Sequence, residues 1–325
     1  MSTALELVAA APELTSIDVE RIAAAVKDST APATRRQYRS HLRRFAAWLD
    51  RRGATATDAT IAAYLAEREA AGAALATLRM DSAAIGAAAK VAGQADPRGP
   101  ITRQALKGFA RRPAAGRGQV DGIGRSEAAA AAGIAAATGT VAGARDAAMI
   151  LLAADALLRI SELAAVRPAD LAYAQDGSGT LHIPRSKTDQ EGEGETVYVT
   201  RSTVAALRRW QEAAIEAWNG SGEYGDGPVF RRVTRSGRVI GDRPLTPNAV
   251  RSILQRRAAA AGIEGRISGH SLRVGSAQSL VRRGASTAEL QQAGRWKDPR
   301  TATRYAAREL AGRGAVARYF EDGGK

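Results

Sequence analysis

Two stretches near the C-terminal end organise the rest of the chain: Ser268-Gly-His-Ser-Leu-Arg-Val-Gly-Ser276 and Gln292-Ala-Gly-Arg-Trp-Lys-Asp-Pro-Arg-Thr-Ala-Thr-Arg-Tyr305. His270 and Arg273 are three residues apart, so a helix that begins at one of the neighbouring serines would project both from one face near its positive N-terminal end. Such a place suits an anion. The hydroxyl of Tyr305 can form a covalent bond with a phosphodiester. The pattern therefore suggests DNA cleavage through a phosphotyrosine.

Each piece alone has a simpler interpretation. A His-x-x-Arg pair on a helix is more often a solvated face or a local hydrogen bond, and Tyr305 alone would be a half-buried aromatic residue with a wet hydroxyl. The hypothesis therefore depends on what lies upstream.

The composition favours a polyanionic partner. The 325 residues include 47 Lys and Arg against 33 Asp and Glu, which gives a net charge of +14. There is no cysteine, and the three histidines lack ligand spacing, so neither a zinc site nor another metal site is expected. No secretory leader is evident, and the longest apolar run, 147–158, is shorter than the roughly 20 residues that span a bilayer. We expect a soluble protein in the cytoplasm, associated with the nucleoid, with no membrane partner.

The first third predicts a small, basic, helical domain. Residues 1–15 resemble a flexible arm, and 16–112 contain four segments of helical periodicity. The expected helices cover 33–49, a segment after Asp58, 73–91 and 102–111. Residues 113–125 are rich in glycine and predict a linker.

The remainder, 126–325, predicts a second, α-rich domain with a small antiparallel β-hairpin or sheet. A strongly apolar helix from Arg145 runs to Arg159-Ile-Ser-Glu162, and two charges at the end of a buried helix need a reason, of which an internal ion pair is the simplest. Strands are expected at 180–184 and 195–199, with Lys187 between them. Further helices are expected at 202–218, from Thr246, from the His270 region and at 287–294, with 231–243 as an arginine-rich connection and 309–325 as a docking tail.

Seven residues in this order resemble the catalytic signature of the tyrosine recombinases, the phage integrase family: Arg159, Glu162, Lys187, His270, Arg273, Trp296 and Tyr305. Trp296 stands nine residues before Tyr305, where most members carry a second histidine, and this resembles the Cre-like branch. The resemblance covers about 126–325 and is thinner in the first domain, where it rests mainly on Phe45-Ala-Ala-Trp48.

The resemblance implies a two-domain, C-shaped DNA clamp, with a core-binding domain followed by a catalytic domain. It implies that Tyr305 attacks the scissile phosphate and remains on its 3′ side. Arg159 and Arg273 would hold the non-bridging oxygens, Lys187 would protonate the departing 5′-oxygen, and His270 would take or relay the tyrosine proton. Trp296 would add an indole N–H and packing, and Glu162 would orient its neighbours. No metal, cofactor or ATP is implied.

The implied partner is double-stranded DNA with an inverted-repeat target site, held by a tetramer whose C-terminal tail docks on a neighbouring protomer; the alternative is that the tail packs on its own protomer. The candidate DNA-binding residues are Arg36, Gln37, Arg79, Met80, Arg243 and Asn248. Asn248 stands where Cre-like members have arginine, and because asparagine prefers adenine in the major groove we expect a different target.

Three other functions stay open at this point. They are a type IB topoisomerase-like enzyme that nicks and reseals one duplex, a non-catalytic DNA-binding protein derived from a recombinase, and a metal-dependent nuclease. The sequence contains no carboxylate cluster that would support the nuclease. Tyr319 is a rival nucleophile without the Trp296 spacing.

Overall fold

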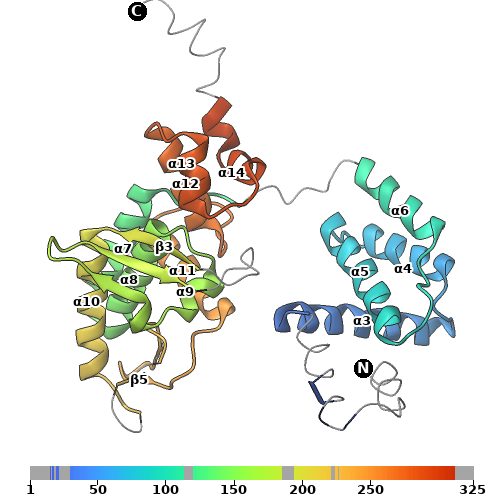
Figure 1. Ribbon diagram of the computed structural model, residues 1–325, viewed down its shortest axis with the longest axis horizontal. Coiled ribbons are helices and arrows are strands. Elements are labelled where there is room, and N and C mark those ends of the chain that lie inside the picture. Colours follow the sequence, from blue (N-terminus) through green and yellow to red (C-terminus); the bar gives the residue numbers. More distant parts are fainter. Residues whose placement is uncertain are drawn as a thin grey trace, which may run out of the picture. The chain divides into compact units, whose positions relative to one another are not determined.

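The computed structural model divides the chain into two compact units, Met1–Gly118 and Gln119–Lys325 (Figure 1). The structure describes residues 15, 17, 20–21, 30–112, 120–184, 194–220, 224–225 and 227–311. All but the last residue of the expected arm, and most of the expected tail, lie outside these residues. In the part of the chain that is described, no helix has both the length and the apolar character needed to cross a membrane.

The first unit is a bundle of helices, as the apolar periodicity predicts. Its helices are α3 (Pro32–Arg52), α4 (Asp58–Ala70), α5 (Leu75–Val91) and α6 (Pro100–Arg111). Prolines at the first turns of α3 and α6 suit positions that need no N–H donor, and Gly53 ends α3 in the left-handed region at φ 56°. The helices enclose one apolar cluster formed by Phe45, Trp48, Ile61, Tyr64, Leu65, Leu78 and Ile85.

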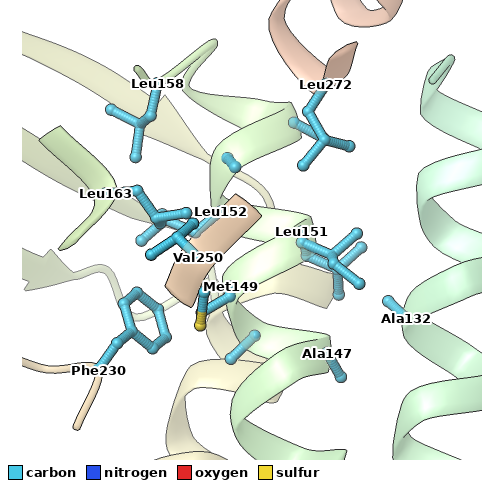
Figure 2. Packing of buried hydrophobic residues seen from close by; sticks show 14 of the residues in the cluster. Ala132, Ala147, Met149, Leu151, Leu152, Leu158, Leu163, Phe230, Val250 and Leu272 are labelled. Atoms are coloured by element: carbon cyan, nitrogen blue, oxygen red, sulfur yellow. The ribbon is translucent and has the colours of Figure 1, made fainter. Parts of the chain in front are cut away.

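The second unit is organised around α8 (Val141–Asp155), which is buried along most of its length. It packs against α7 (Arg125–Ala137), α10 (Arg201–Glu216), α11 (Pro247–Ala260) and α12 (Ser271–Arg282). Figure 2 shows Ala132 of α7 and Leu272 of α12 beside the leucines of α8. Four buried alanines of α7 recur at helical spacing, so their small side chains let the two helices approach closely. This packing explains the alanine-rich run.

A three-stranded antiparallel sheet lies in the same unit. Its order is β1 (Leu171–Tyr173), β2 (Gly179–Ile183) and β3 (Glu195–Val199), with Leu181 opposite both Leu171 and Val197. Gly179, Leu181 and Ile183 are buried, while Thr180 and His182 between them are exposed, which is the predicted alternation. The two expected strands are confirmed, and β1 is an addition.

The stretch 231–243 was expected to be a plain connection, and that prediction is wrong. It contains the hairpin of β4 (Arg232–Val233) and β5 (Val239–Ile240). Arg231 is 2% exposed, and its guanidinium lies 4.7 Å from the ring centroid of Trp218 and 4.1 Å from that of Tyr224. Cation–π packing therefore anchors the stretch.

The second half of the expected linker is also ordered. Ile123 is 3% exposed, and its N–H donates to the carbonyl oxygen of Ser271 at 2.9 Å. A Cβ on Gly275 would lie 2.0 Å from the carbonyl oxygen of Ile123, so only glycine permits this approach of α12. Residues 121–124 thus form an edge of the second unit rather than a free connection.

Candidate active site

Trp296 and Tyr305 meet in a third apolar cluster, formed where α12, α13 (Thr287–Gly294) and α14 (Pro299–Ala311) pack together. Figure 1 shows these three helices side by side in the second unit. The two rings are stacked, with centroids 5.1 Å apart and planes at 19°. Trp296 is 6% exposed, whereas Tyr305 is half-buried. A Cβ on Gly294 would meet the indole at 2.1 Å, so this glycine makes room for the tryptophan.

Arg273 lies beneath this stack and is 1% exposed. Its guanidinium is 4.8 Å from the centroid of Trp296 and donates to the carbonyl oxygens of Leu157 and Gly294. Burial lowers the pKa of Arg273 to about 10, and the charges of Arg159 and Arg295 act in the same direction. The guanidinium is therefore still charged at neutral pH, and the site holds a fixed cation.

Arg159 and Glu162 form the ion pair that the sequence predicts. Arg159 is the N-cap residue of α9 (Ile160–Ala165), and its Nη1 lies 2.5 Å from Glu162 Oε1. The backbone N–H of Arg159 donates to Glu162 Oε2 at 3.0 Å. Burial raises the pKa of Glu162, but the hydrogen bonds from Arg159 and the nearby arginine charges outweigh it, and the pKa is lowered overall. The carboxylate is thus ionised at neutral pH and holds the Arg159 side chain.

Arg295 belongs to the same cluster and was missed by the sequence analysis. Its side chain is 2% exposed, its Nη2 lies 2.8 Å from Glu162 Oε2, and its Nη1 donates to the carbonyl oxygen of Ala156 at 2.6 Å. The residue ends α13 in the left-handed region, at φ 53°. An arginine at a helix end in a chain this basic gives no signal of burial, so the sequence offered no means of finding it.

Two further predicted site residues are His270, at the N-terminal end of α12, and Lys187. His270 is the N-cap residue of α12, is exposed, and its backbone N–H donates to Ser268 Oγ at 3.2 Å. It therefore differs sharply in burial from Arg273, with which it was expected to share a helix face. Lys187 lies outside the described residues, as does Tyr319.

The six candidate DNA-binding residues lie on both units. In the first unit, Arg36 and Gln37 are exposed on α3, Arg79 is exposed on α5, and Met80 is half-buried there. In the second unit, Arg243 and Asn248 are exposed, the latter in the first turn of α11. The five exposed residues are accessible to a duplex, and the role of all six stays a prediction.

Taken together, the buried cluster carries three guanidinium groups around one buried carboxylate. Arg159, Arg273 and Arg295 outnumber Glu162, and Tyr305 stacks on the tryptophan that covers Arg273. Uncompensated buried charge is costly, whereas fixed guanidinium groups bind phosphate oxygens strongly. The arrangement is chemically suited to hold a phosphodiester beside a tyrosine hydroxyl.

Comparison with known proteins points the same way. A model of the phage integrase family matches residues 128–310. An integrase/recombinase XerD homologue from Selenomonas ruminantium is 29% identical over 167 residues, 50% of this chain and 47% of the relative. The recombinase Cre of Escherichia phage P1 is also 29% identical, over 192 residues, 55% of this chain and 54% of Cre. The chain thus spans about half the length of the curated relatives it matches.

Solved structures share the fold. XerH site-specific recombinase bound to palindromic difH substrate matches with a TM-score of 0.60 at 16% identity, covering 82% of this chain and 72% of XerH. The Tn1549 transposon integrase in complex with transposon right end DNA matches with a TM-score of 0.61 at 15% identity, covering 89% and 96%. The predicted fold class, mainly helical with a small antiparallel sheet, is confirmed.

Proposed function

Because the chain belongs to the phage integrase family, we propose that it is a site-specific recombinase that cuts and rejoins DNA strands through a 3′-phosphotyrosine at Tyr305. The observation that carries the proposal is the stack of Tyr305 on Trp296 above the buried guanidinium of Arg273, beside the Arg159 and Glu162 pair. A nucleophile and two arginines of this kind are what in-line attack on a phosphodiester requires.

The proposed reaction has two steps, cleavage of one strand and rejoining to another. The Tyr305 oxygen forms a bond to phosphorus as the bond from phosphorus to the 5′-oxygen breaks. The tyrosine proton passes to His270, and Lys187 gives a proton to the departing oxygen. Arg159 and Arg273 stabilise the charge on the non-bridging oxygens, and losing one such preorganised donor typically costs about 2.7–4 kcal/mol. A 5′-hydroxyl from another strand then reverses the attack without ATP, because the phosphotyrosine conserves the bond energy.

Exchange between two duplexes requires several protomers. We propose that the two units of each protomer clamp one half of an inverted-repeat site, and that four protomers hold two sites together through the tail at 309–325. Arginine contacts to phosphates would supply most of the affinity, while Arg36, Gln37, Arg79, Met80, Arg243 and Asn248 are the proposed contacts for recognition of the site.

A covalent-complex assay tests the chemistry. The protein is incubated in EDTA with a nicked suicide duplex made from the inverted repeats that flank its own gene, and the products are separated on a denaturing gel. We expect a covalent protein–DNA band that disappears in Tyr305→Phe and persists in the matched control Tyr319→Phe. A band that depends on Tyr319, or that EDTA abolishes, would contradict the mechanism.

Two further assays, of supercoil relaxation and of binding to the target, separate the competing functions. Relaxation of supercoiled DNA without exchange between two target sites would indicate a topoisomerase-like enzyme. Tight binding to the target without any covalent band would indicate a non-catalytic DNA-binding protein.

A further inference from the structure

Two strained residues meet inside the candidate active site. Among the described residues other than glycine, only Leu157 and Arg295 have a positive φ, at 45° and 53°. Nη2 of Arg295 donates to the carbonyl oxygen of Leu157 at 3.4 Å, and Arg273 donates to the same oxygen. The left-handed conformation is unfavourable for residues with a Cβ, and it persists where the surroundings over-determine it, which is most often at functional sites. An arginine in this backbone conformation therefore indicates that its side chain has a function at the site.

The side chain of Arg295 joins three parts of the second unit. It projects from the turn between α13 and α14, the turn that also carries Trp296. Its two terminal nitrogens contact the carbonyl of Ala156, at the end of α8, and the carboxylate of Glu162 on α9. Its Nε donates no hydrogen bond and lies 3.6 Å from Glu195 Oε2, at the start of β3. Arg295 thus fixes the turn to the elements that present Arg159.

The carboxylate of Glu162 is divided between two guanidinium groups. Its Oε1 pairs with Arg159 and its Oε2 pairs with Arg295. Without Arg295, Oε2 would keep only the hydrogen bond from the backbone N–H of Arg159. A carboxylate oxygen accepts more than one hydrogen bond, so the Arg159 guanidinium could then bind both oxygens in the bidentate geometry that arginine and carboxylate groups favour. Arg159 would then be turned toward Glu162 and largely neutralised. With Arg295 in place, Oε2 accepts from Arg295 and from the backbone N–H of Arg159. The Arg159 guanidinium therefore pairs with Oε1 alone, and its charge stays available to an anion.

We propose that Arg295 is a positioning residue for the phosphodiester reaction: it takes up one oxygen of Glu162, so that Arg159 stays oriented toward the phosphate, and it locks the Trp296 turn to the end of α8. The inference rests on the proposed function, because it assigns Arg295 a part in the same reaction. Burial also lowers the pKa of Arg295, and the Glu162 charge opposes this shift, in keeping with a cation held by that carboxylate.

The test uses Arg295→Gly, because glycine suits a φ of 53° and removes the side chain without new backbone strain. Single-turnover cleavage of the suicide duplex should slow by about 10- to 100-fold, the scale of losses caused by small misplacements of reacting groups. Non-covalent binding, measured in the Tyr305→Phe background, should change by less than about 3-fold, because the phosphate backbone contacts that dominate affinity are untouched. Arg295→Lys, which keeps the charge but not the two-pronged geometry, should recover part of the rate.

A double-variant comparison separates positioning from general destabilisation. If Arg295 acts through Arg159, then adding Arg295→Gly to Arg159→Ala should cost less than about 3-fold in cleavage rate. Thermal unfolding of Glu162→Gln, Arg295→Gly and the double variant should be non-additive, since the two side chains are in contact. This second measurement does not depend on any cleavage activity.

The outcomes distinguish the two proposals. A wild-type protein that forms no covalent band with its target refutes the proposed function and, with it, the catalytic effect of Arg295. A wild-type band together with Arg295→Gly cleaving within about 3-fold of wild type overturns the Arg295 inference and leaves the proposed function standing. Full multiplicative losses in the Arg159→Ala background, or additive unfolding, overturn it in the same way.

Discussion

Substitution of Trp296 separates the packing of the site from its hydrogen bonding. The indole is 6% exposed, stacks on Tyr305 with centroids 5.1 Å apart, and lies over Arg273. Truncation to alanine removes a buried aromatic side chain, which costs about 3–5 kcal/mol of unfolding free energy. It also removes an aromatic pair worth about 0.5–1.5 kcal/mol. Trp296→Ala should therefore destabilise the second unit strongly and leave Tyr305 without the surface that orients it.

Trp296→Phe keeps a ring against Tyr305 and loses the indole N–H. If packing dominates, as the burial of the ring indicates, Trp296→Phe should cleave the suicide duplex within about 10-fold of wild type, while Trp296→Ala loses at least about 100-fold, the scale reported for one lost preorganised donor or a small misplacement. Urea unfolding of each variant, alongside single-turnover cleavage, provides the comparison. A phenylalanine variant that is as slow as the alanine variant while remaining nearly as stable as wild type would refute the reasoning, since the N–H would then carry the effect.

Two further predictions concern the elements around the site. Gly275→Ala should destabilise the second unit by about 1–3 kcal/mol, because its Cβ would meet the Ile123 carbonyl oxygen at 2.0 Å; the matched control Gly133→Ala, with no atom within 4 Å of its Cβ, should be neutral or stabilising in the same urea titration. Glu162→Gln should destabilise the protein at pH 7, and its difference from wild type should shrink as the pH falls through the lowered pKa of Glu162, because a depressed carboxyl pKa contributes stability that is lost on protonation. A difference between these two proteins that grows as the pH falls would contradict the proposed charge of Glu162.

Much of the fold followed from periodicity and end signals in the sequence. The segment 287–294 was predicted as a helix and is α13, and the alternation of Leu181 and Ile183 with polar residues identified β2. Both depend on local patterns that survive without tertiary context. The strands β4 and β5 are two residues long, which is too short to show an alternating pattern. Their position depends instead on the packing of Arg231 against the rings of Trp218 and Tyr224, and local periodicity does not reveal such contacts.

In the candidate active site, too, the contacts between residues close in sequence were predicted and the distant ones were not. Arg159 and Glu162 are three residues apart, at the N-cap and the third position of α9, so their pairing follows from the local geometry of a helix start. Arg295 is 133 residues from Glu162, and its burial depends on a left-handed backbone at the end of α13. Helix ends in that conformation usually carry glycine. Nothing in the local sequence distinguishes this arginine from the many that are exposed.

The partners of the buried arginines decide what the site can bind. Arg273 donates to the backbone carbonyl oxygens of Leu157 and Gly294, and Arg295 donates both to the carbonyl oxygen of Ala156 and to the Glu162 carboxylate. A carbonyl oxygen orients a guanidinium without cancelling its charge, whereas a carboxylate does both. Because the buried Glu162 carboxylate is shared between Arg295 and Arg159, the cluster keeps an excess of positive charge among the described residues. The folded protein bears the cost of holding these cations before any ligand arrives, so in the proposed reaction a phosphodiester would meet donors that need no further reorganisation.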